Sequence, residues 1–185
     1  MGLILVRHTR PDVAEGLCYG QMDLGVADTF ADEAAAVLSA LPVVRRVVSS
    51  PLRRCRALAK FIADAADLPM DIDQRLKEID FGAWEGRPWS EVPRREIDAW
   101  AENFLHARPH GGESVAMLRS RVGAALADWS ARCEPIAIVT HAGVIKVAST
   151  GDGDPVWDFD VPVGFGGIIA LPDVNEDPAG RSKHD

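Results

Sequence analysis

Two short apolar segments of this chain each lead directly to a histidine. Residues 3–6 (LILV) precede Arg7 and His8, and residues 136–139 (IAIV) precede His141 after a single threonine. Short apolar runs of this kind are typical of buried strands in a parallel sheet. Ligands of open α/β sheets bind beyond the carboxyl ends of the strands. If the two strands are neighbours, two imidazoles and a guanidinium meet at one point, which is a suitable site for a phosphate group.

The rest of the chain alternates strand-like and helix-like segments. This alternation predicts an α/β fold with three layers (α/β/α) and a mostly parallel central sheet covered on both faces. We expect a single domain over residues 1–185, with a helical cap or insert at about 87–112. The other expected elements are a helix over about 29–41, a strand within 43–50, a helix with Pro51 in its first turn, a strand over 70–72, a helix from Ser114, a helix from Ala142 and a final strand near 167–171.

Composition limits the possible partners and compartments. The formal net charge of -8 argues against nucleic acid as the main partner, because duplex-binding proteins need a basic face. No apolar run approaches the roughly 20 residues that span a bilayer, and the short apolar start lacks the pattern of a signal peptide. We therefore expect a cytoplasmic protein with no membrane partner, and the sequence leaves its oligomeric state open.

The sequence predicts neither a metal site nor a bound cofactor. The three cysteines (Cys18, Cys55 and Cys133) have no paired spacing, so reduced thiols are expected. Asp152 and Asp154 flank a glycine, but they lack the number of ligands found in a calcium loop. A polar turn is the expected interpretation of that segment.

Two further segments carry side chains suited to phosphate chemistry. Residues 49–56 (SSPLRRCR) place three arginines at a strand end and a helix start, where neighbouring side chains diverge. One arginine can therefore point into the crevice; the alternative is a charged first turn on the surface. Residues 76–86 (LKEIDFGAWEG) combine three acids with aromatic residues and glycines. A carboxyl group in such a loop can serve as a general acid, and the alternative is a glycine-rich turn with solvated acids.

Together these four segments, in this order, resemble the motifs of the histidine phosphatase superfamily, whose fold is shared with cofactor-dependent phosphoglycerate mutases. The family's Arg-His-Gly motif corresponds to RHT here, which places its nucleophile on His8. Its Ser-x-Leu-x-Arg segment corresponds to SPLRR and places a phosphate-binding arginine on Arg54. Its Leu-x-Glu-x-x-Phe-Gly-x-Trp-Glu-Gly loop places the proton donor on Glu78, and its second histidine is His141.

The resemblance extends from Leu3 to about Ala148. It includes a GGES stretch at residues 111–114, which is followed by Arg121. The chain length and the residues of the motifs are most similar to those of the alpha-ribazole phosphatase branch. The resemblance implies a metal-independent phosphomonoesterase that hydrolyses a small phosphate ester through a phosphohistidine, with alpha-ribazole 5'-phosphate as the candidate substrate.

The resemblance also implies a role for each site residue. His8 attacks as a neutral imidazole, Arg7 and Arg54 clamp the phosphoryl oxygens, and a protonated His141 would donate to the same oxygens. Glu78 gives its proton to the leaving alcohol. The expected catalytic residues are Arg7, His8, Arg54, Glu78 and His141. The expected substrate-binding residues are Arg7, Arg10, Gly20, Gln21, Arg54, His141 and Ala142.

Four positions near the first histidine depart from the family pattern. Thr9 replaces a glycine, and Arg10 and Pro11 replace the usual Glu or Gln and Thr or Ser. Ala14 stands where the family has an asparagine that binds phosphate. Arg10 adds a cation near the mouth of the site. It either compensates for the missing asparagine or selects an additional anionic group on the substrate.

Two other functions remain open from the sequence. A phosphoglycerate mutase would use the same chemistry, but it must shield the phosphohistidine from water, which usually takes a larger covering insert than this chain offers. A non-catalytic phosphate-binding adaptor fits the departures at Thr9 and Ala14, although binding alone would not require Glu78. In each case the expected partner is a small-molecule phosphate ester.

Overall fold

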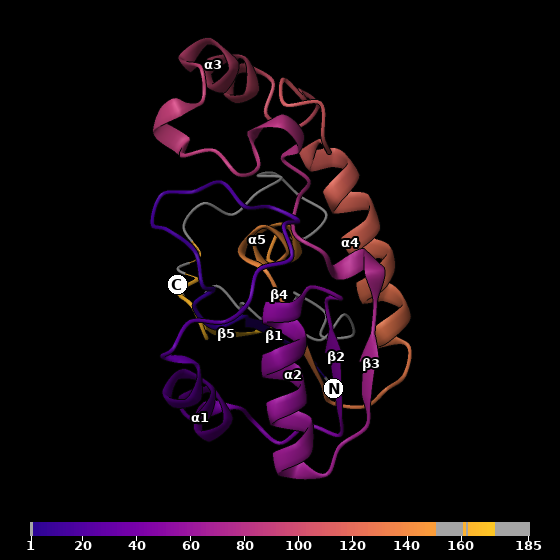
Figure 1. Cartoon of the computed structure of the whole chain (residues 1–185). Coiled ribbons are helices and arrows are strands. Elements are labelled where there is room, and N and C mark those ends of the chain that lie inside the picture. The colour runs from indigo at the N-terminus through magenta and orange to yellow at the C-terminus, as the bar shows by residue number, and fades with distance from the viewer. Residues whose placement is uncertain (1, 151–160, 162, 173–185) are drawn as a thin grey trace, which may run out of the picture.

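The structure is a computed structural model that describes residues 2–150, 161 and 163–172. Asp152 and Asp154, for which a polar turn is expected, lie outside these residues. Within the described part of the chain, five strands form one sheet in the order β3-β2-β4-β1-β5 (Figure 1). They are β1 (Leu3–Arg7), β2 (Arg46–Ser49), β3 (Met70–Ile72), β4 (Ile136–Thr140) and β5 (Ile168–Ala170). All neighbouring strands pair in parallel except β5, which runs antiparallel to β1, so the predicted mostly parallel sheet is confirmed.

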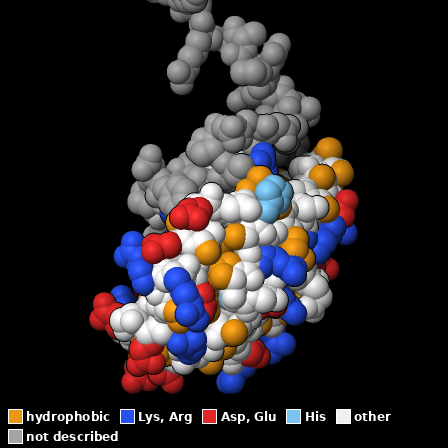
Figure 2. All heavy atoms as spheres, turned by 90° about the horizontal axis from the view of Figure 1, so that it is seen from above, with side chains coloured by type: hydrophobic (Ala, Val, Ile, Leu, Met, Phe, Trp, Pro, Cys, Tyr) orange, Lys and Arg blue, Asp and Glu red, His pale blue; other side chains and the backbone are white. Residues whose placement is uncertain are grey.

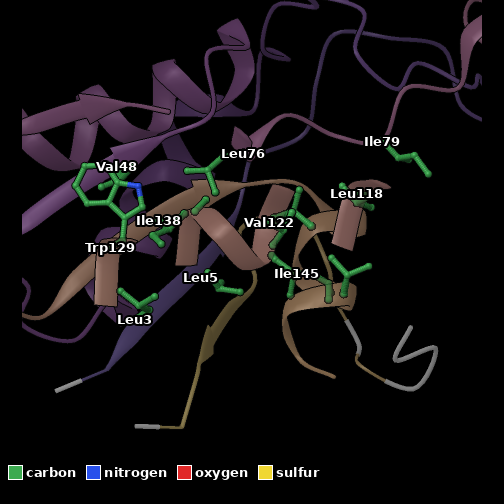
Figure 3. Close-up of a cluster of buried hydrophobic side chains, with 14 of the residues drawn as sticks. Leu3, Leu5, Val48, Leu76, Ile79, Leu118, Val122, Trp129, Ile138 and Ile145 are labelled. Atoms are coloured by element: carbon green, nitrogen blue, oxygen red, sulfur yellow. The ribbon is translucent and has the colours of Figure 1, made fainter. Parts of the chain in front are cut away.

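The two faces of the sheet are covered by different helices, as the alternation of side chains along a strand requires. The helices are α1 (Phe30–Ala40), α2 (Arg53–Ala66), α4 (Val115–Ser130) and α5 (Ala142–Ala148). Leu5 packs with residues of α4 and α5 in one buried cluster (Figure 3). Its neighbours Ile4 and Val6 pack with residues of α1 and α2 in a second cluster on the opposite face. The predicted three-layer α/β/α fold is therefore confirmed.

The sheet order brings together strand ends that are far apart in the sequence. β4 lies between β2 and β1, with Arg7 opposite Thr140 and Ser49 opposite Val139. The residues that follow these three parallel strands therefore emerge at one edge of the sheet. The condition on which the phosphate site depends, that the two histidine-bearing strands are neighbours, is met.

The start of α2 differs from the prediction. Pro51 is expected in the first helical turn, but Leu52 is the N-cap residue, with an extended backbone, and the helix begins at Arg53. The cause is the preceding residue: the Ser50 amide still donates to the carbonyl of Val139, 3.0 Å away, which continues the strand direction past β2. The turn is thereby delayed, and Arg54 becomes the second residue of the helix.

The segment between β3 and α4 holds short helical turns and many aromatic side chains. Its elements are η1 (Gln74–Leu76), η2 (Gly82–Trp84), η3 (Trp89–Glu91) and α3 (Arg94–Glu102). α3 lies at the top of Figure 1, away from the sheet, and Figure 2 shows acidic, basic and hydrophobic side chains intermixed on the molecule seen from above. Trp84 is fully buried and contacts Phe81, Trp89 and Trp100 through ring edges and faces. Trp100 therefore packs this segment against the core.

Among the described residues, no helix combines the length and the apolar composition needed to cross a bilayer. All three cysteines are free thiols; Cys18 and Cys55 are buried and Cys133 is exposed.

The predicted helix from Ser114 begins with a capping hydrogen bond. Ser114 caps α4, because its hydroxyl accepts a hydrogen bond from the Met117 amide.

Candidate active site

His8 is buried at the end of β1 and is held by backbone groups. Its amide donates to the carbonyl of Thr140, 3.0 Å away, which continues the pairing of β1 with β4. Its Nδ1 lies 2.7 Å from the carbonyl of Thr9. A carbonyl oxygen can only accept, so Nδ1 carries the proton and Nε2 presents a lone pair.

The surroundings of His8 keep its imidazole neutral. Burial is the largest cause, and the positive charges of Arg54 and Arg7 act in the same direction, so that the pKa of His8 falls from 6.5 to about 3. At neutral pH the Nε2 lone pair is therefore free to act as a nucleophile. Nε of Arg54 donates to it across 3.3 Å.

This low pKa predicts a dependence of stability on pH. The unfolded chain protonates His8 near pH 6.5 and the folded chain only near pH 3, so acid favours the unfolded state between these values. We expect the free energy of unfolding of the wild type to fall, between pH 7 and pH 4.5, by about 2–3 kcal/mol more than that of a His8→Asn variant. Urea unfolding at the two pH values measures the difference, and the same substitution at the exposed His106 is the control. Parallel losses in the wild type and His8→Asn would contradict the assignment.

Arg54 is a fully buried cation that has no acidic partner among the described residues. Its Nη1 donates to the carbonyl of Met22 (2.6 Å), and its Nη2 donates to the carbonyl of Gly20 (2.7 Å). The guanidinium carbon lies 5.1 Å from the centre of the Tyr19 ring, within the range of a cation–π contact. Burying a charge is costly unless it is paired, and carbonyl dipoles supply only part of that pairing. The arrangement is suited to an anion that binds beside His8.

His141 completes the group at the end of β4. Its Nδ1 accepts from Nη2 of Arg54 (3.3 Å), because a guanidinium can only donate. The proton therefore lies on Nε2, which donates to the hydroxyl of Ser50, 2.8 Å away. Burial is the largest cause of a pKa of His141 well below 6.5, and the adjacent His8 imidazole and the charge of Arg54 act in the same direction. His141 is thus neutral in the unliganded protein, and its predicted role as a charged donor requires a bound dianion that favours its protonation.

Glu78 lies at the start of α5, the helix that directly follows His141. Its Oε2 accepts from the Gly143 amide (3.1 Å), and its Oε1 accepts from the Ile79 amide (2.9 Å). Its carboxylate is therefore held next to His141, which directly precedes α5. This placement leaves the group within the site, as the predicted role of proton donor requires.

Arg121 fixes the loop that carries Glu78. It makes a two-pronged ion pair with Glu113, through Nε and Nη2 at 2.7 and 2.8 Å. Its remaining donors hold the carbonyls of Arg75, Lys77 and Glu78 at 2.6–2.9 Å. In the sequence Arg121 stands out only through the family resemblance; its position shows that it supports the Glu78 loop.

Replacing Arg121 with methionine tests this support. The apolar stem is retained, but three carbonyls and the Glu113 carboxylate lose their donor, and Glu78 loses its fixed position. We expect kcat to fall roughly 10- to 100-fold, less than the full contribution of general acid–base assistance (about 10²–10⁴-fold), because Glu78 itself is retained, while KM changes little. The rates are compared per folded molecule, with Arg132→Met, which replaces an exposed arginine just beyond α4, as the control. A rise in KM with unchanged kcat would contradict a role through Glu78.

Gly20 and Gln21 hold other residues of the site in place through hydrogen bonds. Gly20 has φ +32°, and a Cβ there would collide with the carboxylate of Glu85, so the turn that offers its carbonyl to Arg54 requires glycine. The Gln21 amide donates to Glu85 (2.8 Å), and its side-chain nitrogen donates to the carbonyl of Glu78 (3.0 Å). Contact of these two residues with substrate stays a prediction.

The guanidinium groups of Arg7 and Arg10 lie over the ring of Phe165, a residue outside the sequence motifs described above. The guanidinium of Arg7 is 4.1 Å from the centre of the Phe165 ring, and that of Arg10 is 5.3 Å from it. The same ring lies 5.7 Å from the His8 imidazole, and Nη1 of Arg7 donates to the carbonyl of Val163. Two residues separate Phe165 from β5, and only the fold brings its ring to the site.

The structure thus brings Arg7, His8, Arg54, Glu78 and His141 together. Ala142, the first residue of α5, is half-buried beside them, and Arg10 is exposed at the rim. Sequence reasoning assigned no role to Ser50, Cys55 and Phe165, which also lie at the site. Cys55 lies 3.4 Å from Nε2 of His141, and burial raises the pKa of its thiol, so it packs beside the imidazole as a neutral group. The hydroxyl of Thr9 is buried without a hydrogen-bond partner among the described residues.

These features define an α/β protein with a neutral histidine and a buried arginine at the carboxyl ends of its strands. The chain belongs to the histidine phosphatase superfamily, because the model of its branch 1 matches residues 3–151. The predicted resemblance is confirmed, and the protein is a phosphatase of this superfamily.

Individual relatives agree with this assignment. A glucosyl-3-phosphoglycerate phosphatase of Mycolicibacterium vanbaalenii is 31% identical over 183 residues, which cover 89% of this chain and 80% of the relative. An adenosylcobalamin/alpha-ribazole phosphatase of Salmonella typhimurium is 29% identical, covering 92% of this chain and 91% of the relative. The crystal structure of a phosphoglycerate mutase from Thermus thermophilus has a TM-score of 0.74 at 29% identity and covers 92% of both chains. The expected phosphoglycerate mutase-like fold is therefore confirmed.

Proposed function

We propose that this protein is a phosphomonoesterase that hydrolyses a small phosphate ester through a phosphohistidine on His8. One observation carries the proposal. The unprotonated Nε2 of a neutral His8 faces the buried guanidinium of Arg54, which has no carboxylate partner among the described residues. A nucleophile and an unneutralised cation this close together suit a phosphoryl group that binds against both of them.

In the first step, Nε2 of His8 attacks phosphorus, and the bond between phosphorus and the ester oxygen breaks. The leaving alkoxide takes a proton from Glu78. Arg7 and Arg54 bind the phosphoryl oxygens, and His141 donates a hydrogen bond to the same oxygens. The product of this step is the free alcohol and a phosphohistidine.

In the second step, a water molecule attacks the phosphohistidine. The phosphorus–nitrogen bond breaks, its electron pair returns to Nε2 of His8, and Glu78 takes the proton of the water. Inorganic phosphate leaves, and the starting protonation states are restored. The Nδ1–H group stays hydrogen-bonded to the Thr9 carbonyl throughout, so the imidazole keeps its orientation.

The names of the relatives suggest two substrates for this chain. Alpha-ribazole 5'-phosphate, which the sequence resemblance also suggests, carries a single anionic group, namely the phosphate that is removed. Glucosyl-3-phosphoglycerate carries a carboxylate in addition. A phosphoglycerate mutase would retain the phosphate on His8 and return it to an acceptor hydroxyl instead of water.

The test is turnover of an ester panel in the presence of EDTA. The panel contains p-nitrophenyl phosphate, alpha-ribazole 5'-phosphate, glucosyl-3-phosphoglycerate and 3-phosphoglycerate, with phosphate release as the readout. We expect release that EDTA does not reduce, together with an acid-labile phosphoenzyme trapped by rapid quenching. Isomerised phosphoglycerate without release would favour the mutase, and phosphate binding with no turnover of any ester would overturn the proposal.

A further inference from the structure

Arg10 is the outermost cation of the site. Its side chain is 61% exposed, whereas His8 and Arg54 are buried. The Phe165 ring links it to the buried groups, because the guanidinium carbons of Arg7 and Arg10 lie 4.1 and 5.3 Å from the centre of that one ring. The sum of those distances is the upper limit of their separation. A small ester held by Arg7 can therefore extend as far as Arg10.

Glu33 orients Arg10 and leaves part of its guanidinium available. The carboxylate accepts from the Arg10 amide (2.8 Å) and from the hydroxyl of Thr29 (2.7 Å), so it is fixed beside the arginine. Its approach to the guanidinium is through Nε alone, at 3.7 Å. Within the described part of the chain, neither Nη of Arg10 has a hydrogen-bond partner. Two parallel N–H donors are what a carboxylate or a phosphate binds best.

Arg10, which Glu33 partly balances, is not needed to balance the charge of the phosphate that is removed. Arg7 and Arg54 carry two positive charges, which match the dianion of a phosphate monoester. Arg10 lies outward of the buried Arg54, with its own side chain exposed. A substrate with a single anionic group leaves this third guanidinium unused, since an exposed charge that binds nothing adds little to affinity.

We propose that Arg10 is a specificity-determining residue that binds a second anionic group, a carboxylate or a phosphate, on the leaving alcohol of the substrate. This inference rests on the proposed function of the same site. It decides between the two alternatives for Arg10: the residue selects a second anion and does not substitute for the family's phosphate-binding asparagine, whose place Ala14 takes. It also favours an ester such as glucosyl-3-phosphoglycerate over alpha-ribazole 5'-phosphate.

Two matched pairs of esters test the inference. In the first pair, 3-phosphoglycerate has a carboxylate where glycerol 3-phosphate has a hydroxymethyl group. In the second pair, fructose 1,6-bisphosphate has one phosphate more than fructose 6-phosphate. We expect kcat/KM of the wild type to favour the doubly anionic member of at least one pair by roughly tenfold. Arg10→Gln should reduce that ratio to near one, and Arg10→Lys should keep part of it. Arg94→Gln, which replaces an exposed arginine paired with Asp98 on α3, is the control and should keep the ratio.

The outcomes separate this inference from the proposed function. A wild-type ratio near one in both pairs, or an equal loss on all four esters in Arg10→Gln, would overturn the role of Arg10 while leaving the phosphatase intact. Failure of the wild type to hydrolyse even p-nitrophenyl phosphate would overturn the proposed function instead. Calorimetric binding of the same esters to His8→Ala, with and without Arg10→Gln, then measures the preference for a second anion without any turnover. Equal dissociation constants within each pair would contradict the inference.

Discussion

Replacing His8 with alanine is expected to abolish turnover, with kcat/KM on p-nitrophenyl phosphate reduced by at least roughly 10⁴-fold. The reaction loses its nucleophile, and the arginines that remain bind the ester without a group to accept the phosphoryl. The fold should persist, because the buried imidazole is held at the end of a strand by backbone groups and its removal relieves the cost of burying a polar ring. Rates are measured with the thermal midpoint as the check on folding.

Two controls make this result specific. His106→Ala, which replaces an exposed histidine outside the site, should keep the wild-type rate. Added imidazole should restore part of the activity of His8→Ala, because the substitution leaves a space of the same shape beside Arg54. Turnover above about one per cent in His8→Ala, without added imidazole, would show that another group attacks phosphorus.

Replacing Arg54 with glutamine should give the second-largest loss, roughly 10³-fold in kcat/KM. The variant removes a buried cation beside the nucleophile and leaves the carbonyls of Gly20 and Met22 without their charged donor. We expect KM to rise and kcat to fall, since the same group binds the ground state and stabilises the transition state. The inhibition constant of inorganic phosphate should rise with it, because phosphate depends on the same guanidinium.

The neighbouring arginine supplies the matched control. Arg53 is exposed and precedes Arg54 on the same helix, so Arg53→Gln makes the same chemical change one position away. We expect Arg53→Gln to retain most of the wild-type kcat/KM. Comparable losses in the two variants would indicate that the net charge of the helix start matters and not the buried position of Arg54.

The pattern of apolar runs was enough to predict the main fold and the centre of the site. Each parallel strand is a local signal, and the rule that ligands bind at carboxyl ends predicted that His8 and His141 would meet if their strands were neighbours. The pairing of β1 with β4 supplies that condition. The spacing of three arginines near α2 could not show which one is buried. That depends on the delayed helix start after Pro51, which follows from a hydrogen bond to β4, a strand nearly ninety residues later in the chain.

The supporting residues were beyond the reach of sequence patterns for a related reason. Phe165, Ser50 and Met22 contribute through a ring face, a hydroxyl and a main-chain carbonyl. Such groups occur throughout any chain, and only a three-dimensional arrangement makes them part of a site. Arg121 carried a signal in its spacing from the GGES stretch, but its contact with the Glu78 loop spans more than forty residues.

The pairing of Arg54 with main-chain carbonyls has a consequence for how the catalytic cycle ends. Inorganic phosphate can bind the unneutralised guanidinium just as an ester can, so a site of this kind is subject to product inhibition. The carbonyls of Gly20 and Met22 provide resting acceptors, at 2.7 and 2.6 Å, to which the guanidinium donates when the anion departs. They lower the cost of emptying the site, and we therefore expect the loop of residues 19–22 to influence the residence time of the product as well as the position of Arg54.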